Sequence, residues 1–287
     1  MITDNLRGAL WMVGSMAGFA VEDAFLKKLS VVMPVGEAMA ILGLAGVVVF
    51  GAICRVAGQR AVPMAMLSRT MAVRSGFEVI GRLFYTLAIA LTPISSASAI
   101  LQASPLVVVL GAALVFGERV GWLRWAVIGL GFAGVLVILR PGLAGFDALS
   151  LLAVAGLIGF SGRDLATRAA PPALSNAQLG VLGFAMLGLS GAILLVISGG
   201  LVLPDGVALA ELAGASVFGI AGYGALTFAM RTGEVGAVTP FRYSRLVFAM
   251  LLGVLAFGER PDAATLVGSA IIVACGLVIL MQGKRRP

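Results

Sequence analysis

Nine ionisable side chains interrupt long apolar stretches of this 287-residue chain. They are Glu22, Asp23, Arg74, Glu78, Arg82, Arg163, Asp164, Arg242 and Arg245. A charge in an apolar environment costs on the order of several kcal/mol unless it is paired or hydrated. Such groups therefore predict either buried ion pairs or a water-filled pathway for a polar solute.

The stretch RTMAVRSGFEVIGRLFYTLAIAL, residues 69–91, contains three of these groups. Arg74, Glu78 and Arg82 are spaced four residues apart, which places them on one face of an α-helix. One interpretation is an ion-pair ladder that only stabilises the fold. The other is that Glu78 and Arg82 line a pathway, with Phe77 and Gly81 beside them.

Two further charged pairs each follow a Gly-Phe dipeptide. Glu22 and Asp23 form one pair, and Arg163 and Asp164 form the other. With Arg245, they are candidates for a gate whose ion pairs form on one side of the membrane while the other side opens. The alternative is a set of permanent salt bridges or boundary charges.

Uncharged polar and aromatic side chains complete the candidate pathway. A buried amide or phenol needs hydrogen-bond partners, which favours Gln102 in SSASAILQASP and Tyr243 in PFRYSR. The predicted pathway residues are Phe19, Phe77, Glu78, Gly81, Arg82, Gln102, Ser104, Phe160, Tyr223, Arg242 and Tyr243. Core packing is the alternative role for each aromatic residue, and helix–helix contact is the alternative for serine.

The composition excludes several classes of protein. Hydrophobic residues make up 60% of the chain and charged residues 11%, with a mean hydropathy of +1.09. Soluble domains carry about 25% charged residues, so we predict an integral membrane protein. The absence of His excludes His-based catalysis and His metal sites, and we expect neither a metal nor a cofactor. The net charge of +7 fits the positive-inside bias of membrane proteins better than nucleic-acid binding.

Apolar runs of about 20 residues, the length that crosses a bilayer as a helix, recur along the whole chain. Proline- and glycine-containing breakers separate them. We predict ten transmembrane helices, at 6–28, 35–57, 70–91, 94–116, 121–140, 148–168, 177–198, 208–231, 235–257 and 262–281.

The two halves of the chain align without a gap in a single register. In it Phe19 matches Phe160, Asp23 matches Asp164, and FGER at 116–119 matches FGER at 257–260. We therefore divide the chain into five-helix repeats at 1–142 and 143–287. Five is odd, so the second repeat enters the membrane from the opposite side. This inverted topology predicts a central cavity between the halves.

The distribution of Lys and Arg predicts the orientation. With the N-terminus inside, 11 of them lie at inner ends and loops, 4 at outer ones and 5 within spans. Both termini are therefore expected in the cytoplasm. The two FGER copies then lie on opposite faces of the membrane, which favours a structural role for them as turns between helices. Gly117 and Gly258 would close a helix, and Glu118 and Glu259 would complement the start of the next one. A gating role for the two glutamates is the alternative.

The duplication, SPLVVVLGAALVFGE (104–118) and SRLVFAMLLGVLAFGE (244–259) resemble the drug/metabolite transporter superfamily, in its EamA-type ten-helix branch. The resemblance covers essentially the whole chain. Leu246 stands where the first half has Pro105, so the ninth helix departs from the family pattern. Within the branch, the chain is similar to YddG-type amino acid exporters. The resemblance implies transport of small metabolites without ATP. It also implies a central cavity enclosed by the third, fourth, eighth and ninth helices with parts of the first and sixth.

We therefore expect a transporter that exports small metabolites, most simply amino acids, across the bacterial inner membrane by alternating access. Arg82, Arg242 or a helix N-terminus would hold the carboxylate of a zwitterion, and Glu78 or Tyr243 its ammonium group. One alternative is an uptake permease for a nucleoside, vitamin or cofactor-like metabolite. Another is a membrane-embedded enzyme or sensor. We expect a monomer in the lipid bilayer without a nucleic-acid partner. The substrate, direction and proton coupling are not determined by the sequence.

Overall fold

The computed structural model describes residues 4–116, 121–140, 147–232 and 238–283, and all regular structure in them is helical. The first half contains α1 (Asp4–Val32), α2 (Val35–Val56), the 3₁₀ turn η1 (Met64–Leu67), α3 (Arg69–Leu91), α4 (Ile94–Leu101), α5 (Ser104–Phe116) and α6 (Trp122–Leu139). The second contains α7 (Ser150–Arg168), α8 (Asn176–Ser198), α9 (Gly206–Arg231), the 3₁₀ turn η2 (Thr239–Tyr243), α11 (Ser244–Phe257) and α12 (Ala263–Gly283).

Local sequence accounts for several helix ends. Ser175 and Gln178 form a reciprocal capping box at the start of α8. The Asp205 carboxylate accepts a hydrogen bond from the amide of Ala208 and starts α9. Gly258 ends α11 with φ of 62°, so its predicted left-handed conformation is confirmed. Gly117, its counterpart in the first half, and Glu118 lie outside the described residues.

Two of the ten predicted helices are discontinuous, and they break at equivalent positions. The predicted helix 94–116 is divided into α4 and α5 at residues 102–103. The predicted helix 235–257 changes from η2 to α11 between Tyr243 and Ser244. The alignment of the two halves places Tyr243 on residue 102 and Ser244 on residue 103, so the two breaks are equivalent. Pro105 has no amide hydrogen to donate to the carbonyl of Leu101, which explains the first break. Pro240 lies in the first turn of η2.

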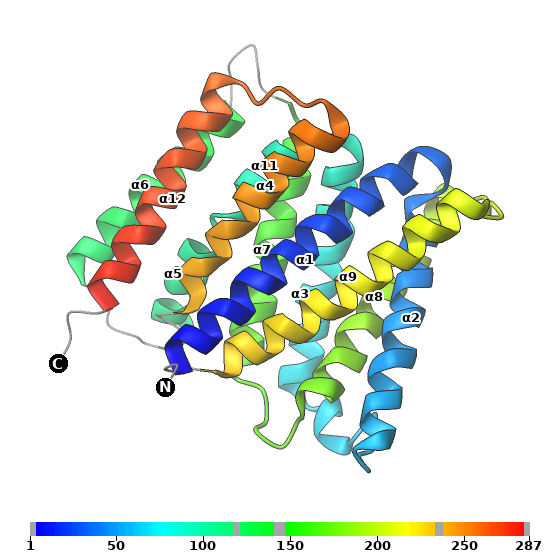
Figure 1. Ribbon diagram of the computed structural model, residues 1–287. Helices are drawn as coiled ribbons and strands as arrows, with labels where there is room; N and C mark the ends of the chain where they lie inside the picture. The colour runs from blue at the N-terminus through cyan, green and yellow to red at the C-terminus, as the bar shows by residue number, and fades with distance from the viewer. Residues whose placement is uncertain (1–3, 117–120, 141–146, 233–237, 284–287) are drawn as a thin grey trace.

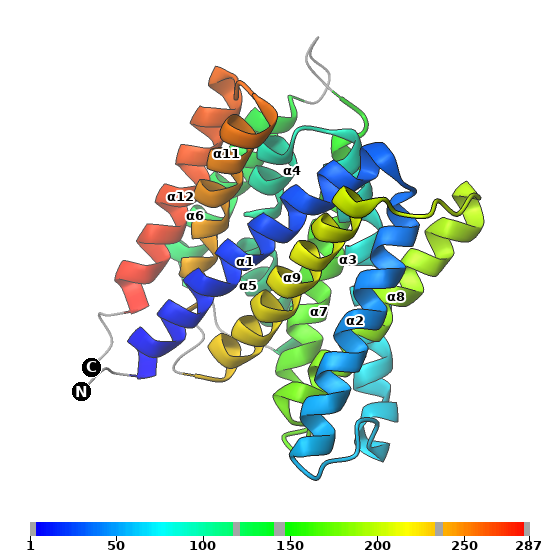
Figure 2. The same cartoon turned by 45° about the vertical axis from the view of Figure 1, so that its right-hand side comes forward.

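The halves interlock instead of forming two separate bundles. The most extensive contacts join α1 to α9, α3 to α7, α2 to α8 and α6 to α12, so each pair takes one helix from each half (Figures 1 and 2). The helix α1 begins and α12 ends at the same end of the bundle, whereas α7 starts at the opposite end. The predicted all-α fold of two inverted five-helix repeats around a central cavity is confirmed.

Close approaches between glycines repeat with the same symmetry. A Cβ atom on Gly18 of α1 would lie 3.1 Å from the Cα atom of Gly222 in α9, which is a tight contact. The equivalent pair, Gly159 of α7 and Gly81 of α3, approaches more closely still, because a Cβ atom on Gly159 would lie 2.3 Å from the Gly81 nitrogen. Glycine lets two helix backbones approach this closely in a membrane. The two contacts therefore fix the same geometry on both sides of the pseudo-two-fold axis.

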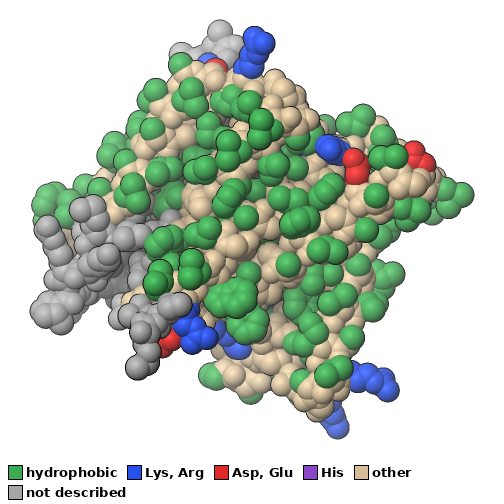
Figure 3. Space-filling view, viewed as in Figure 1, with side chains coloured by type: hydrophobic (Ala, Val, Ile, Leu, Met, Phe, Trp, Pro, Cys, Tyr) green, Lys and Arg blue, Asp and Glu red, His purple; other side chains and the backbone are tan. Residues whose placement is uncertain are grey.

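The outer surface suits a bilayer, and the protein is a multi-pass membrane protein. Hydrophobic side chains dominate the face in Figure 3, while charged side chains gather near its ends. Large apolar residues such as Leu44, Val196 and Leu255 are exposed on the bundle, as expected for contact with lipid. Within the described residues, five segments are long and apolar enough to span a membrane, namely α1, α2, the α4–α5 unit, α8 and α9. In α3 the apolar character is interrupted by the charges that face inward.

Candidate functional site

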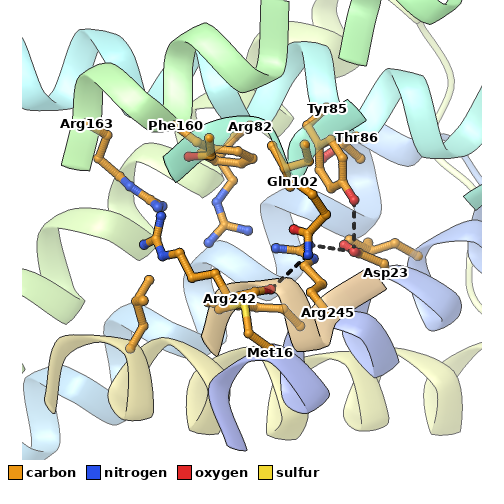
Figure 4. Close-up of a pocket in the computed structure, with 15 residues that line it drawn as sticks. Met16, Asp23, Arg82, Tyr85, Thr86, Gln102, Phe160, Arg163, Arg242 and Arg245 are labelled. Carbon is orange, nitrogen blue, oxygen red and sulfur yellow. Dashed lines mark hydrogen bonds and ion pairs between the residues drawn. The ribbon is translucent and has the colours of Figure 1, made fainter. Parts of the chain in front are cut away.

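A narrow cavity of about 50 Å³ lies between the halves, beside both helix breaks (Figure 4). Its volume has room for roughly three or four water molecules. Its walls come from α1, α3, α7, α9 and the two discontinuous helices. The lining residues are Met16, Phe19, Asp23, Leu26, Arg82, Tyr85, Thr86, Leu101, Gln102, Ser104, Phe160, Arg163, Leu226, Arg242 and Arg245.

The charged part of this wall is mainly cationic. Arg82 extends from α3, Arg163 from α7, Arg242 from η2 and Arg245 from α11, whereas Asp23 of α1 is the acidic residue among the lining residues. The side chains of all five are nearly buried. Guanidinium groups this far from bulk water need counter-charges nearby.

Glu78 supplies one such counter-charge from behind the cavity wall. Its carboxylate is fully buried and lies 3.3 Å from the Arg74 guanidinium, 3.4 Å from Arg82 and 3.2 Å from Arg163. The first two contacts are the ladder predicted from the four-residue spacing in α3. The third crosses to α7 in the other half. One carboxylate therefore holds three arginines together.

The repeat-equivalent carboxylates Asp23 and Asp164 each bind an arginine from the second break. Asp23 accepts a hydrogen bond from Arg245 at 2.5 Å and another from the Tyr85 hydroxyl at 3.2 Å. Asp164 pairs with Arg163 at 2.9 Å and with Arg242. Both acids are thus held by the η2–α11 segment, so the charge pattern is less symmetric than the backbone.

The other gate candidate, Glu22, lies outside the cavity lining. Its carboxylate is 3.5 Å from Arg82 within the same half of the chain. Arg163 instead pairs with Glu78 and Asp164. The equivalent positions Glu22 and Arg163 therefore do not pair with each other.

Neutral polar groups join the two breaks. The Gln102 side-chain amide donates a hydrogen bond to the backbone carbonyl of Arg242 at 2.9 Å. The hydroxyls of Ser104 and Ser161 are 3.1 Å apart, which links α5 to α7. Arg242 is the residue before Tyr243, the repeat equivalent of Gln102. The hydrogen bond from Gln102 therefore spans the pseudo-two-fold axis.

Aromatic rings pack against three of the lining arginines. The Arg245 guanidinium lies 5.3 Å from the ring centre of Phe19 and 5.2 Å from that of Tyr85. Arg163 and Arg82 lie 4.8 Å and 5.9 Å from the ring centre of Phe160. These distances are in the range of cation–π attraction, which helps to hold cations in a largely dry environment.

A second cavity, of about 440 Å³, extends from the site towards one end of the bundle. Arg163 and Leu226 line both cavities and so stand between them. The Arg74 guanidinium donates hydrogen bonds there to the Tyr223 hydroxyl at 2.5 Å and to the Thr167 hydroxyl at 2.9 Å. The far rim includes Pro172 and the exposed Arg231, so this cavity opens at the end where α7 and α9 finish.

The opposite end is closed by Glu259. Its carboxylate accepts hydrogen bonds from the amides of Ile94 and Ser95, at 2.9 and 3.2 Å, and from the Ser95 hydroxyl at 2.7 Å. The Lys27 ammonium lies 3.2 Å away and also donates to the carbonyl of Thr92. We call this group of contacts the Glu259 clamp. It joins the ends of α1 and α3 and the start of α4 to the turn after α11.

The clamp corrects the prediction for Glu259. We expected this carboxylate to complement the next helix, α12, but it binds the start of α4 in the other half. Asp262 caps α12 instead, by accepting a hydrogen bond from the amide of Thr265. Partial burial opposes ionisation of Glu259. The hydrogen bonds from Ser95 and Ile94 and the charge of Lys27 outweigh that effect and hold the pKa of Glu259 below its usual value.

The structure brings most of the predicted pathway residues to the two cavities. Phe19, Arg82, Gln102, Ser104, Phe160 and Arg242 line the first, and Tyr223 lines the second. Phe77 and Gly81 instead pack between α3 and α7, against Gly162 and Phe160. Tyr243 is buried but lines neither cavity. Its neighbour Arg242 faces the cavity in its place.

Several lining residues were missed by the sequence analysis. Tyr85 and Thr86 follow Arg82 by three and four residues, so the helical face of Arg82 already indicated them. Met16, Leu26, Leu101 and Leu226 carry no such signal, because apolar residues fill most positions of every helix. Within the described residues, no three His, Cys, Asp or Glu side chains gather in a way that could hold a metal ion.

Comparisons with known proteins agree with this architecture. The sequence model of the EamA-like transporter family matches residues 6–140 and again 147–281. The starts of the two matches are offset in the same register that aligns Phe19 with Phe160. A chain of known crystal structure superposes with a TM-score of 0.67 at 23% identity, covering 97% of this chain and 98% of that one.

Three curated relatives are similar over much of their length. A riboflavin transporter of Rhizobium johnstonii is 28% identical, covering 78% of this chain and 72% of the relative. An S-adenosylmethionine uptake transporter of Rickettsia prowazekii is 25% identical, covering 71% and 69%. A pseudopaline exporter of Pseudomonas aeruginosa is 29% identical, covering 96% and 97%. These relatives are described by cargoes other than free amino acids.

Proposed function

Because this chain belongs to the EamA-like transporter family, we propose that it carries a vitamin- or cofactor-like metabolite across the membrane by alternating access. The protein is a secondary transporter and not an enzyme. Transport of this kind needs a central site that is open to one side of the membrane at a time.

The main support for alternating access is the unequal state of the two ends. One end has the 440 Å³ cavity, which shares Arg163 and Leu226 with the central cavity. At the other end a recess of about 370 Å³ shares no lining residue with the central cavity, and Lys27 of the Glu259 clamp lines that recess. The small central cavity lies between them and contacts both halves. Movement of the halves about the pseudo-two-fold axis would open the closed end and close the open one.

The relatives favour a cofactor-like cargo over a free amino acid. Their names specify riboflavin, S-adenosylmethionine and pseudopaline. Export of an amino acid, in the manner of YddG-type exporters, remains the second candidate. It is supported by the mixture of Arg82, Arg242 and Asp23 in the cavity wall, which would suit a zwitterion. Uptake and export both occur among the relatives' names, so they do not determine the direction.

We infer the orientation from the distribution of charge along the sequence, and the monomeric assembly from the helices around the central cavity. The excess of Lys and Arg at the ends expected inside supports cytoplasmic termini, in a bacterial inner membrane. On that basis the larger cavity opens to the cytoplasm and the Glu259 clamp closes the outer side. A monomer suffices, because the described helices of one chain already surround the central cavity.

Counterflow in proteoliposomes tests the proposal. Vesicles containing the full chain are loaded with unlabelled riboflavin, S-adenosylmethionine or an amino acid, and uptake of the same labelled compound is followed. Transient accumulation of one of the first two, reduced in Arg82→Gln but not in Arg55→Gln, supports the cofactor-like cargo. Arg55 is an exposed arginine at the end of α2, so it controls for loss of charge. Accumulation of amino acids alone would instead support an amino acid as the cargo.

A further inference from the structure

The buried charges of the site do not balance. Among the nine ionisable residues of the central network, five are arginines and four are carboxylates, which leaves one excess positive charge. The imbalance is larger at the cavity surface, where four arginines face one aspartate. Glu22, Glu78 and Asp164 pair with these arginines without lining the cavity.

Some hydrogen-bond donors of the lining arginines also have no partner among the described residues. The Nε atoms of Arg242 and Arg245 are buried and make no hydrogen bond to any described residue, whereas the Arg82 Nε atom faces Glu78 as an ion pair at 3.4 Å. Buried donors normally have partners, and a missing partner is unfavourable, most of all for a charged group. In Figure 4 the Arg82 guanidinium points into the cavity, with Arg163 and Arg242 on one side and Arg245 on the other.

Two of the four lining arginines come from the second helix break and have no charged counterpart at the first break. Arg242 and Arg245 both line the cavity, and their equivalents in the first repeat are Leu101 and Ser104. These two line the cavity as well. The symmetric backbone therefore presents two arginines on the α11 side of the cavity. On the α4–α5 side it presents the apolar Leu101 and the hydroxyl group of Ser104. The cavity can distinguish the two ends of a bound solute.

We propose that the substrate carries an anionic group, a carboxylate or a phosphate, which binds among Arg82, Arg163 and Arg242. The uncharged part of the substrate faces Leu101 and Ser104. This inference rests on the proposed transport function and restricts its cargo to cofactor-like metabolites with an acidic group. The anion would neutralise the excess charge and accept a hydrogen bond from the Arg242 Nε atom, which lacks a partner among the described residues. Arginine suits this role because its planar guanidinium group can bind either anion through two parallel hydrogen bonds.

The first arm of the test compares compounds that differ only in the acidic group. Counterflow is measured for S-adenosylmethionine and its decarboxylated analogue, for riboflavin 5′-phosphate and riboflavin, and for methionine and methionine amide. We expect the acidic member of at least one pair to exchange about tenfold faster or more, as charge-assisted hydrogen bonds imply. Exchange of a neutral member as fast as or faster than its acidic partner would overturn the inference while keeping the transporter.

The second arm does not need the natural cargo. The melting temperature of the purified full chain is measured against inorganic phosphate and acetate at constant ionic strength. A ligand that binds only the folded state raises the melting temperature in a saturable way. We expect saturation in the wild type and in Arg55→Gln, and its loss in Arg82→Gln and Arg242→Gln. The Arg82→Lys variant keeps the charge without the planar fork, and it should bind these anions more weakly than the wild type.

The two arms separate the two proposals. One outcome is that anion binding saturates in the wild type and is lost in the Arg82 and Arg242 variants, while no compound pair is exchanged. That outcome supports the anion site and rejects the tested cargoes. A melting temperature that rises without saturation, and equally in all variants, means an adventitious ion only and overturns the anion site. If the Gln variants do not fold, the paired compounds and the wild-type saturation curve decide the question. Absence of both exchange and saturable binding rejects both proposals.

Discussion

The side-chain amide of Gln102 donates a hydrogen bond of 2.9 Å to the backbone carbonyl of Arg242. Gln102 lies at the break between α4 and α5, and Arg242 lies one residue before the end of η2. The contact therefore ties the discontinuous helix of one half to that of the other. It does so at the wall of the central cavity, where any relative movement of the halves must be transmitted.

Replacement of Gln102 by Met tests this connection, because Met has a similar length and no amide. The carbonyl of Arg242 would lose its donor, and we expect the protein to be destabilised by about 1 kcal/mol. Counterflow should fall more strongly than stability, since the two breaks would no longer move together. Thermal unfolding and initial exchange rates are measured in parallel. Gln59→Met, at an exposed position after α2, should change neither, and equal exchange in both variants would contradict the prediction.

Glu78→Gln should be the most damaging single change in the charged network. It leaves Arg74, Arg82 and Arg163 without their shared carboxylate in a buried site. Removal of one partner from a buried ion pair costs about 3–5 kcal/mol. The comparison is Asp4→Asn, which breaks an exposed pair with Arg7 and should cost at most about 1 kcal/mol. Unfolding in denaturant measures both, and equal small losses would show that the three arginines do not depend on Glu78.

Removal of the charge on Glu259 should open the end of the bundle that it closes. Glu259→Gln keeps the shape but weakens the hydrogen bonds to Ile94 and Ser95 and the pairing with Lys27. A Leu26→Cys variant reports the opening, because Leu26 is buried in the cavity wall on α1. We expect a membrane-impermeant thiol reagent to label this cysteine several-fold faster when Glu259 is replaced.

The matched control for the clamp is Asp262→Asn. Asp262 follows Glu259 in the same turn but contacts Arg140 and Thr265 and not α4. It should leave the labelling of Leu26→Cys unchanged. Faster labelling in both variants would mean that the whole turn is loosened, and the specific role of Glu259 would be lost.

The Glu259 clamp should also make the stability of the folded protein depend on pH in the acid range. Its contacts hold the pKa of this carboxyl below the usual value for Glu, near 4.3. A depressed pKa in the folded state means that the contribution is complete above the unfolded pKa. It is lost as the pH falls through the folded pKa. The difference in melting temperature between wild type and Glu259→Gln should therefore be constant above about pH 5 and shrink below it. A difference that grows towards acid pH would reverse the assigned sign.

The close approach of α3 and α7 predicts an effect of side-chain volume at Gly159. A Val there would collide with the backbone of Gly81 and push the two helices apart. We expect failure to fold or a large loss of stability, measured by yield in the membrane and thermal unfolding. Gly76→Ala on α3 has open space around it and should be neutral or slightly stabilising. Tolerance of Gly159→Val would show that the helices are not held at this distance.

The sequence predicted the parts of the site that depend on spacing along the chain. The four-residue intervals between Arg74, Glu78 and Arg82 were enough to place them together. The internal repeat also located the two halves of the cavity. The third partner of Glu78 is Arg163, which comes from another helix, and spacing along α3 carries no information about it.

Contacts between the halves were the part that could not be predicted. A glutamate near a helix start indicates that it can cap a helix, but it does not specify which helix. Proximity along the chain therefore indicated α12 as the partner of Glu259, although the fold brings the start of α4 to it. Tyr243, which lines neither cavity, illustrates a similar point. Equivalent positions in a repeat share a backbone environment, but the side chain that reaches the cavity from the second break belongs to Arg242.

The pairing of the long helices across the two halves has a consequence for biosynthesis. When the ribosome has completed α1 to α6, none of the main packing partners of α1, α2 and α3 has yet been made. The newly inserted α3 carries Arg74, Glu78 and Arg82 before Arg163 and Asp164 exist. The nascent first half must therefore remain in the bilayer as loosely associated helices until their partners are synthesised. The native bundle can form only after the second half has been inserted among them.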